Sequence, residues 1–312
     1  SNNHSPALFA MNCGLPRMGY PCVGSWVTYG LGSESDSLPA FVVMSDPKGR
    51  GLPKGHAANW GAGFLPSVYQ GTHFRPTGDP IDNLKRPTGM NAEQQRRQLD
   101  LLKTLNQQHF EVNPFEESLA ARIESFELAY RMQSAAPEAL AVDKEPEHIR
   151  AMYGLDDDKC KHVAAQCLTA RRMVERGVRF IQLTCPGGNG DRWDQHGGLK
   201  AGHEKNAKSV DQPIAALLAD LETRGLLDST LLVWMGEFGR TPFAQGNNGR
   251  DHNPFGFSLW MAGAGVKGGT VYGGTDEYGY KAVDKRLEIH DLHATMLHLL
   301  GCLLYTSDAA DE

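Results

Sequence analysis

The 312-residue sequence lacks features that would assign it at once to a familiar class of protein. Its longest apolar run, from Phe257 to Ala264, is broken by glycine and is far shorter than the roughly 20 residues of a membrane-spanning helix. It has no block of basic residues, and its formal net charge is -6, so nucleic acids and anionic membranes are poor partners. Its six cysteines form no C-x-x-C pair, which argues against a zinc knuckle or a disulfide scaffold.

A phosphate-binding loop is absent as well. The glycine-rich stretch from Gly265 to Gly269 lacks the G-x-x-x-x-G-K-[ST] order and follows a strand pattern without opening a helix, so a turn is expected there. The hydrophobic content, by contrast, is 40%, which is enough for a sizeable core. The length suits one large α/β domain or two smaller ones.

The pattern of apolar residues predicts the main elements. Residues 1–86 are rich in glycine, proline, asparagine and serine, which favours short strands and long loops. Helical spacing predicts amphipathic helices over 92–110, around 119–130 and over 158–176. A strand over 178–184, a helix over 203–224 and a strand over 229–235 form a βαβ pattern, which predicts a parallel central sheet. A strand over 257–261 and a helix over 291–300 follow.

Polar side chains follow the predicted strands at the points where a parallel sheet binds its ligands, beyond the carboxyl ends. They form three clusters, which are Asp194 with His196, Glu237 with Arg240, and Asp251 with His252. Carboxylate and imidazole together are the ligand set of zinc or a similar divalent ion. Each cluster alone also suits a simpler role as a turn cap, an ion pair or a loop contact. Their shared sheet edge favours a common site.

Histidines near the C-terminus need separate treatment, because three of them lie on or just before the last predicted helix. His293 and His298 are five residues apart and do not share a helical face, so a metal site made by this helix alone is not expected. His298 is assigned to the surface or the core. His293 lies in the first turn, from which a contact with the site stays open.

Several motifs, taken in order along the chain, resemble a known family. They are Gly24–Gly32, Trp193–His196, Gly236–Pro242, Gly249–Pro254, Gly273–Gly279 and His290–Thr295. This series is similar to the sulfatase-like family called domain of unknown function 1501. The resemblance implies membership of the alkaline phosphatase superfamily, with a three-layer αβα sandwich and a mainly parallel central sheet over residues 1–302. Members of that superfamily hydrolyse or transfer phosphate and sulfate esters at a two-metal site.

The resemblance also implies roles for individual residues. Asp194, His196, Glu237 and His252 would bind a divalent metal, with zinc preferred and manganese, calcium or magnesium as alternatives. Arg240 would hold the anionic group of the substrate. Asp251 and His293 would contact the metal ligands without binding the metal themselves. His4 occupies the place of the sulfatase nucleophile, and Ser5 is the alternative.

Both ends of the sequence depart from the family pattern. The first strand of the sheet and its metal-binding aspartate are expected before Ser1. Export to the periplasm or the cell exterior is implied by the resemblance alone. Residues 303–312 resemble translated adapter sequence, and we expect a non-native or disordered tail there.

Two functions of different classes follow. One is a metal-dependent hydrolase acting on an anionic small-molecule or glycan ester. The other is an exported, non-catalytic relative that binds a sulfated or phosphorylated glycan or a protein partner. A phosphate-moving mutase ranks third, because it needs a serine nucleophile that the sequence does not identify.

Overall fold

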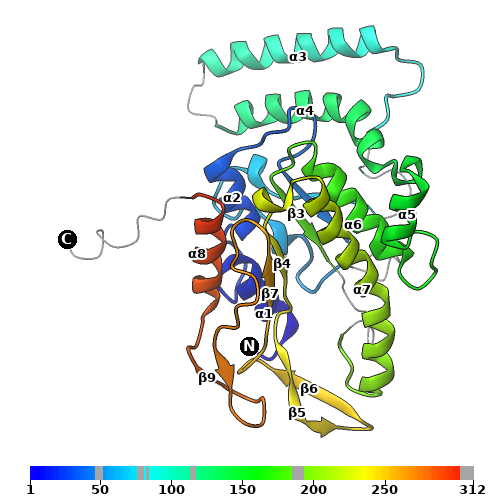
Figure 1. Ribbon diagram of the computed structural model, residues 1–312. Helices are drawn as coiled ribbons and strands as arrows, with labels where there is room; N and C mark the ends of the chain where they lie inside the picture. The colour runs from blue at the N-terminus through cyan, green and yellow to red at the C-terminus, as the bar shows by residue number, and fades with distance from the viewer. Residues whose placement is uncertain (46–51, 76–80, 82–83, 113–116, 185–192, 303–312) are drawn as a thin grey trace.

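The computed structural model describes residues 1–45, 52–75, 81, 84–112, 117–184 and 193–302. The protein is mixed α/β, with a small parallel sheet, small antiparallel sheets and helices around them (Figure 1). The predicted tail over 303–312 lies outside the described residues. Among the helices described, none has the length and apolar character needed to cross a membrane.

The parallel sheet has three strands in the order β2-β1-β3. Strand β1 (Phe41–Met44) lies in the middle, between β2 (Thr72–Phe74) and β3 (Phe180–Leu183). Every side chain of β1 is buried, as expected for an apolar strand that has a neighbour on each side and is covered on both faces. The side chains of β3 are only partly buried.

The predicted strand over 229–235 is present as β4 (Leu232–Trp234), but its pairing differs from the expected parallel one. The βαβ pattern predicts that it belongs to a parallel sheet, whereas β4 pairs antiparallel with β7 (Trp260–Ala262), and β3 pairs with β1. An apolar strand pattern reveals burial but not the identity of the neighbouring strand, and this explains the difference. A parallel sheet is therefore confirmed, but it is smaller than predicted.

Two further antiparallel pairs lie near the end of the fold that carries the site. Strand β5 (Gly239–Gln245) pairs with β6 (Gly249–Asn253) as a hairpin, and β8 (Gly274–Thr275) pairs with β9 (Ala282–Asp284). The segment 249–253, for which the sequence pattern predicts no strand, is thus a strand. Hairpin β5–β6 carries Arg240 and His252 directly opposite each other.

Helices cover the sheet elements. The predicted helices are present as α3 (Ala92–Val112), α4 (Glu117–Leu140), α6 (Lys161–Val174), α7 (Leu199–Thr223) and α8 (Ile289–Leu299), with α5 (Glu147–Tyr153) between them. The described residues also form the short helical segments η1 (His56–Trp60), η2 (Ser67–Tyr69), η3 (Val142–Lys144) and η4 (Leu227–Ser229). Helices α3 and α4 form an antiparallel hairpin at the top of Figure 1.

Two helices in the first 86 residues are not predicted by the sequence pattern. They are α1 (His4–Cys13) and α2 (Val23–Leu31), in a region whose glycine and proline content favours loops. Helix α1 ends at Gly14, whose φ of 80° is the left-handed conformation that glycine adopts without strain. Its apolar residues do not lie on one face, so helical spacing could not reveal it.

The core extends along both sides of the strands. On one side, residues of α5, α6 and α7 pack with Leu183, Leu232 and Trp234. On the other side, residues of α1, α2 and α8 pack with Phe180, Leu231 and Val233. Alternate residues of β4 thus face different helices, which is the burial expected for a strand covered on both faces.

Candidate metal centre

Four chain segments bring titratable side chains together beyond the carboxyl ends of β3 and β4. The segment after residue 192 contributes Asp194 and His196, and the β5–β6 hairpin contributes Arg240 and His252. The first turn of α1 contributes His4, and Glu237 follows β4. These residues therefore meet beyond the carboxyl ends of the strands, where the sequence predicts a common site.

The carboxylate of Asp194 is the centre of the cluster. Its Oδ1 accepts a hydrogen bond from Arg240 Nη2 at 2.7 Å. The same oxygen lies 3.1 Å from His252 Nε2 and 3.1 Å from His196 Nε2. Its Oδ2 lies 3.3 Å from His4 Nε2. One carboxylate thus faces four nitrogen-bearing side chains.

These contacts determine the charge of Asp194. Burial by itself would raise its pKa, but the contacts with Arg240 and His252, together with the positive charges of Arg240 and His4, outweigh burial and lower the pKa to about 2. The group is therefore ionised throughout the physiological range. An ionised carboxylate is the form that binds a metal ion.

Three of these atoms form a nearly equilateral triangle. Asp194 Oδ1, His196 Nε2 and His252 Nε2 are 3.0 to 3.1 Å apart. Ligand atoms at a tetrahedral zinc lie about 2.0–2.1 Å from the metal, so neighbouring ligands lie roughly 3.3 Å from one another. The triangle therefore has nearly the size of one face of a tetrahedral metal site.

The hydrogen bonds of the Nδ1 atoms of His196 and His252 show where the lone pairs of their Nε2 atoms point. His252 Nδ1 lies 2.6 Å from the Asn2 carbonyl, which only accepts, so this nitrogen carries the proton. His196 Nδ1 lies 2.6 Å from Gln245 Oε1 and donates to it in the same way. In the neutral rings both Nε2 atoms then direct lone pairs at the Asp194 carboxylate. Such a set of electron donors requires a cation between them, either a proton or a metal ion.

Within the part of the chain that the structure describes, two groups of three residues each have their ligand atoms within 4.8 Å of one another. One is His4, Asp194 and His252, and the other is His196, Asp251 and His252. Both contain His252, which places this histidine at the middle of the candidate site. The structure thus provides histidine and aspartate groups able to hold a metal, as the sequence predicts.

Glu237 lies at the edge of the cluster. Its Oε1 is bound by His4 Nδ1 at 2.6 Å, so His4 bridges the two carboxylates of Glu237 and Asp194. The hydrogen bond to Glu237 raises the pKa of His4 against the opposing effect of burial. His4, considered from the sequence as a replacement for a nucleophile, is therefore also a possible ligand.

Arg240 has a free donor in a buried position. Its Nη2 is bound to Asp194, while its buried Nη1 has no hydrogen-bond partner among the described residues. The guanidinium lies 5.7 Å from the ring centre of Phe238. Trp193 Nε1 is a second buried donor without a partner in the described chain, and both residues line the same cavity. Buried donors of this kind normally meet an acceptor.

The remaining predicted site residues have other contacts. The Asp251 carboxylate accepts from the backbone N–H of His252 at 2.8 Å, whereas the second ring nitrogen of His252 binds Asn2. His293 Nε2 donates to the Met11 carbonyl at 2.7 Å and so joins α8 to α1. Ser5 makes no side-chain hydrogen bond or ion pair with the residues that the structure describes.

Several supporting residues were not found from the sequence. Gln245 and the Asn2 carbonyl orient the two histidines, and a polar residue in a turn gives no sign of such a role. Gly249 is informative in a different way. A Cβ built there would lie 2.0 Å from the carbonyl of His196, so only glycine allows the hairpin to approach this loop.

A family comparison covers almost the entire chain. Residues 1–306 match the family described as protein of unknown function, DUF1501. The chain belongs to the DUF1501 family. Neither the curated proteins nor the solved structures gave a match. For this DUF1501 member, function has to be argued from the geometry of the cluster itself.

Proposed function

We propose that this protein is a metal-dependent hydrolase of phosphate or sulfate esters. The observation that supports this most directly is the triangle of Asp194 Oδ1, His196 Nε2 and His252 Nε2, with edges of 3.0 to 3.1 Å. Two imidazoles and one carboxylate, with one position left for a water molecule or substrate, are the ligand set of many catalytic zinc sites. A bound metal would polarise an ester oxygen and activate a water molecule.

Zinc suits these ligands best. Imidazole nitrogen favours zinc, manganese or iron over the harder magnesium and calcium, which prefer oxygen ligands throughout. The protonated Nδ1 atoms are held by the Asn2 carbonyl and Gln245, which fixes both rings with their lone pairs inward. Manganese, calcium and magnesium are the alternatives to be compared with zinc.

Arg240 would bind the anionic group of the ester. Its unpartnered Nη1 is close to Asp194 and hence to the triangle, and a guanidinium can bind two oxygens of a phosphate or sulfate at once. Trp193 Nε1 provides a second donor to the same cavity. We therefore infer an anionic small-molecule or glycan ester as the substrate class.

His4 would donate a proton in this site. The hydrogen bond to Glu237 raises its pKa, which favours the protonated ring, with Nδ1 directed at Glu237 and Nε2 at Asp194. A substrate that displaces the longer 3.3 Å contact with Asp194 would meet the proton on Nε2. His4 is then the general acid for the leaving oxygen, and Glu237 maintains its charge.

One observation favours a second, non-catalytic function. Arg240 already neutralises the carboxylate that a metal would bind, through the 2.7 Å contact with Asp194 Oδ1. A site of this kind could bind a sulfated or phosphorylated glycan, or a partner protein, without turning it over. Export to the periplasm or cell exterior and an alkaline phosphatase-like three-layer fold are part of both proposals and rest on the sequence resemblance.

Metal titration combined with turnover separates these functions. We would measure zinc binding to the chelator-treated protein by calorimetry, and hydrolysis of nitrophenyl phosphate and nitrophenyl sulfate with zinc added. His252→Asn should weaken zinc binding and lower turnover by at least about tenfold, since ligand support alone is worth 10–100-fold. The exposed His148→Asn variant is the matched control. Zinc binding without turnover would support the binding protein, and unchanged zinc binding in His252→Asn would contradict the metal-dependent hydrolase.

A further inference from the structure

Helix α3 packs on the rest of the protein through one face only. Arg96 marks this packed face, because its guanidinium donates to both carboxylate oxygens of Glu127 on α4, at 2.7 and 3.0 Å, and lies 5.1 Å from the ring centre of Tyr130. In Figure 1, α4 lies between α3 and the remainder of the fold. The opposite face of α3 is therefore directed away from the protein.

The outward face of α3 carries an apolar stripe. At about 100° per residue, three apolar residues lie about 140–180° around the helix from Arg96, and they are Leu101, Leu105 and Val112. Their exposed fractions are 60%, 52% and 78%, and no residue of α3, all of which the structure describes, is buried. A single exposed leucine is ordinary, but apolar side chains in line on the far side of a helix indicate a contact surface.

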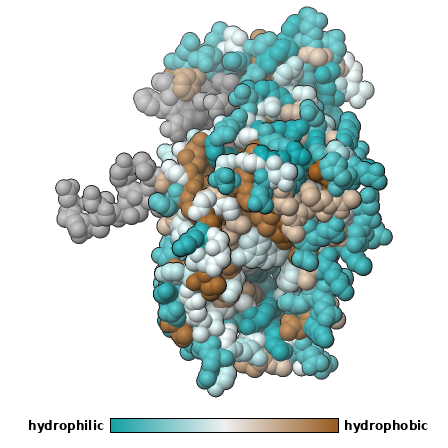
Figure 2. Space-filling view, in the orientation of Figure 1, coloured by the Kyte–Doolittle hydropathy of each residue, from teal (hydrophilic) through white to brown (hydrophobic). Residues whose placement is uncertain are grey.

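The outward face has the spacing of a coiled coil. Six residues follow one another at alternating intervals of four and three, and we call them the seam: Gln94, Gln98, Leu101, Leu105, Gln108 and Val112. These intervals are those of the a and d positions of a heptad repeat. The charged residues of α3 all lie outside the seam, and they are Glu93, Arg96, Arg97, Asp100, Lys103 and Glu111. The flank of the α3–α4 hairpin that is visible in Figure 2 is accordingly mainly hydrophilic.

We propose that two copies of this chain associate through α3 as an antiparallel, two-stranded coiled coil. With Leu105 opposite Leu101 of the second copy, the two-fold axis also places Gln98 opposite Gln108. Leucine then meets leucine at the centre of the seam, and the glutamine amides on either side can hydrogen-bond to each other. Leu102, which is 42% exposed, lies beside this centre and meets its own counterpart.

Charge complementarity supports the antiparallel orientation. Arg97 and Glu111 each stand immediately before a seam residue, and in an antiparallel pair such positions meet across the interface. Arg97 of each copy then faces Glu111 of the other, whereas a parallel pair would place Arg97 opposite Leu102. Helix α3 has three acidic and three basic residues, so two copies of it do not repel each other although the chain has a net charge of -6.

The length and composition of the seam determine the strength of the contact. Helix α3 has 21 residues and is therefore about 31 Å long, which corresponds to about three heptads. This is the lower limit for a coiled coil. Half of the seam is glutamine, and polar residues at such positions fix the alignment of the helices at a cost in stability. The dimer is therefore reversible and depends on protein concentration.

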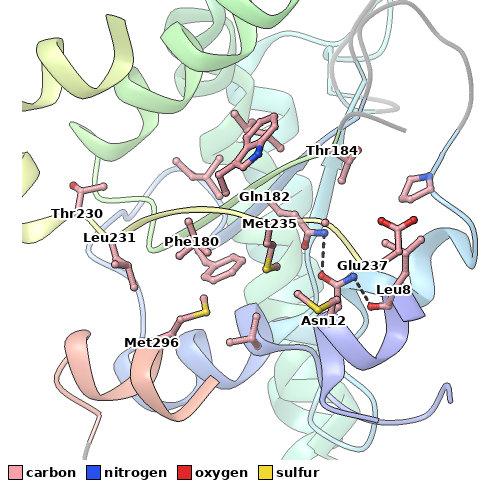
Figure 3. A pocket seen from close by; sticks show the side chains of 18 of the residues that line it. Leu8, Asn12, Phe180, Gln182, Thr184, Thr230, Leu231, Met235, Glu237 and Met296 are labelled. Carbon is pink, nitrogen blue, oxygen red and sulfur yellow. Dashed lines mark hydrogen bonds between the residues drawn. The ribbon is translucent and has the colours of Figure 1, made fainter. Parts of the chain in front are cut away.

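The proposed contact is separate from the candidate metal centre. The cavity beside that centre extends from Thr230 and Leu231 at one end to Leu8 and Glu237 at the other (Figure 3). No residue of α3 is among those that line it. Association through α3 therefore leaves the cavity open, and it can be tested independently of any hydrolase activity.

Sedimentation equilibrium over a range of protein concentrations tests the association. The parent chain should approach twice the mass of one chain as its concentration rises. Leu101→Glu should raise the dissociation constant of the dimer at least about tenfold, because each copy then brings a charge into the centre of the contact. Leu287→Glu is the matched control, since Leu287 is 61% exposed and lies outside α3, and it should leave the constant unchanged. Circular dichroism should show the same helix content in all three proteins.

An exchange of charges tests the orientation. Arg97→Glu and Glu111→Arg should each weaken the dimer, and the double variant should restore it, because opposite charges then face each other again. A double variant no tighter than the single ones would contradict the antiparallel pair. A parent chain that stays monomeric, or a dimer that Leu101→Glu leaves intact, would overturn the proposal. Binding of a monomeric parent to phosphatidylglycerol vesicles, lost in Leu101→Glu, would assign the stripe to a lipid surface and overturn it too.

Discussion

The negative charge of Asp194 allows the most quantitative prediction. Contacts with Arg240 and His252 lower the pKa of this carboxyl from 3.8 to about 2, although burial acts in the opposite direction. The side chain is 24% exposed, so the effect is only partly screened by solvent. One pKa unit corresponds to about 1.4 kcal/mol, and the charge therefore stabilises the metal-free fold by at most about 2 kcal/mol. Asp194→Asn removes the charge and keeps the shape.

Urea unfolding of the metal-free protein at several pH values measures this effect. A depressed pKa adds stability that is complete above the unfolded value near 4 and is lost as the pH falls toward 2. Asp194→Asn should therefore be less stable than the parent by up to about 2 kcal/mol at pH 7, and the difference should disappear toward pH 2. The exposed Asp211→Asn is the control, with a change within about 0.5 kcal/mol. A difference that is absent at pH 7, or independent of pH, would refute the reasoning.

Three further predictions concern other parts of the structure. Asp220 is 3% exposed and is bound by two arginines and a tyrosine. Asp220→Asn should therefore lower the free energy of unfolding in urea by roughly 3 kcal/mol, whereas the exposed Glu222→Gln should leave it almost unchanged. Gly249→Ala should weaken zinc binding although it removes no ligand, because its Cβ meets the neighbouring loop at 2.0 Å; Gly268→Ala, with open space around it, should not. Burial lowers the pKa of His293, so stability should fall as pH drops below about 6.5, and His293→Gln should flatten that slope in thermal melts at pH 7 and 5.

The helices show what the sequence could reveal. The prediction of 92–110 corresponds to α3 at 92–112, and that of 203–224 corresponds to α7 at 199–223. Helical spacing is a local signal, and it reveals an amphipathic helix even when no residue is buried, as in α3. Helix α1 escaped prediction because its apolar residues are distributed around the helix. The partner of β4 also escaped, because strand pairing is decided by distant parts of the chain.

The candidate site likewise has a part that the sequence predicts and a part that it does not. The sequence placed Asp194, His196 and His252 beyond strand ends, and the structure brings all three within 3.1 Å of one another. The pairing of His4 with Glu237 joins residues 233 positions apart, and no local pattern indicates it. Likewise, the Asn2 carbonyl that orients His252 is a backbone group, and residue type gives no sign of its role.

X-ray absorption of the protein loaded with one equivalent of zinc tests the central proposal most directly. The account predicts two imidazole nitrogens at about 2.0–2.1 Å and at least one carboxylate oxygen. It also predicts that one nitrogen is lost in His252→Asn and that both are retained in the exposed His148→Asn variant. A zinc ion with no histidine ligand, or a spectrum that is identical in the parent and His252→Asn, would contradict a metal centre at Asp194, His196 and His252.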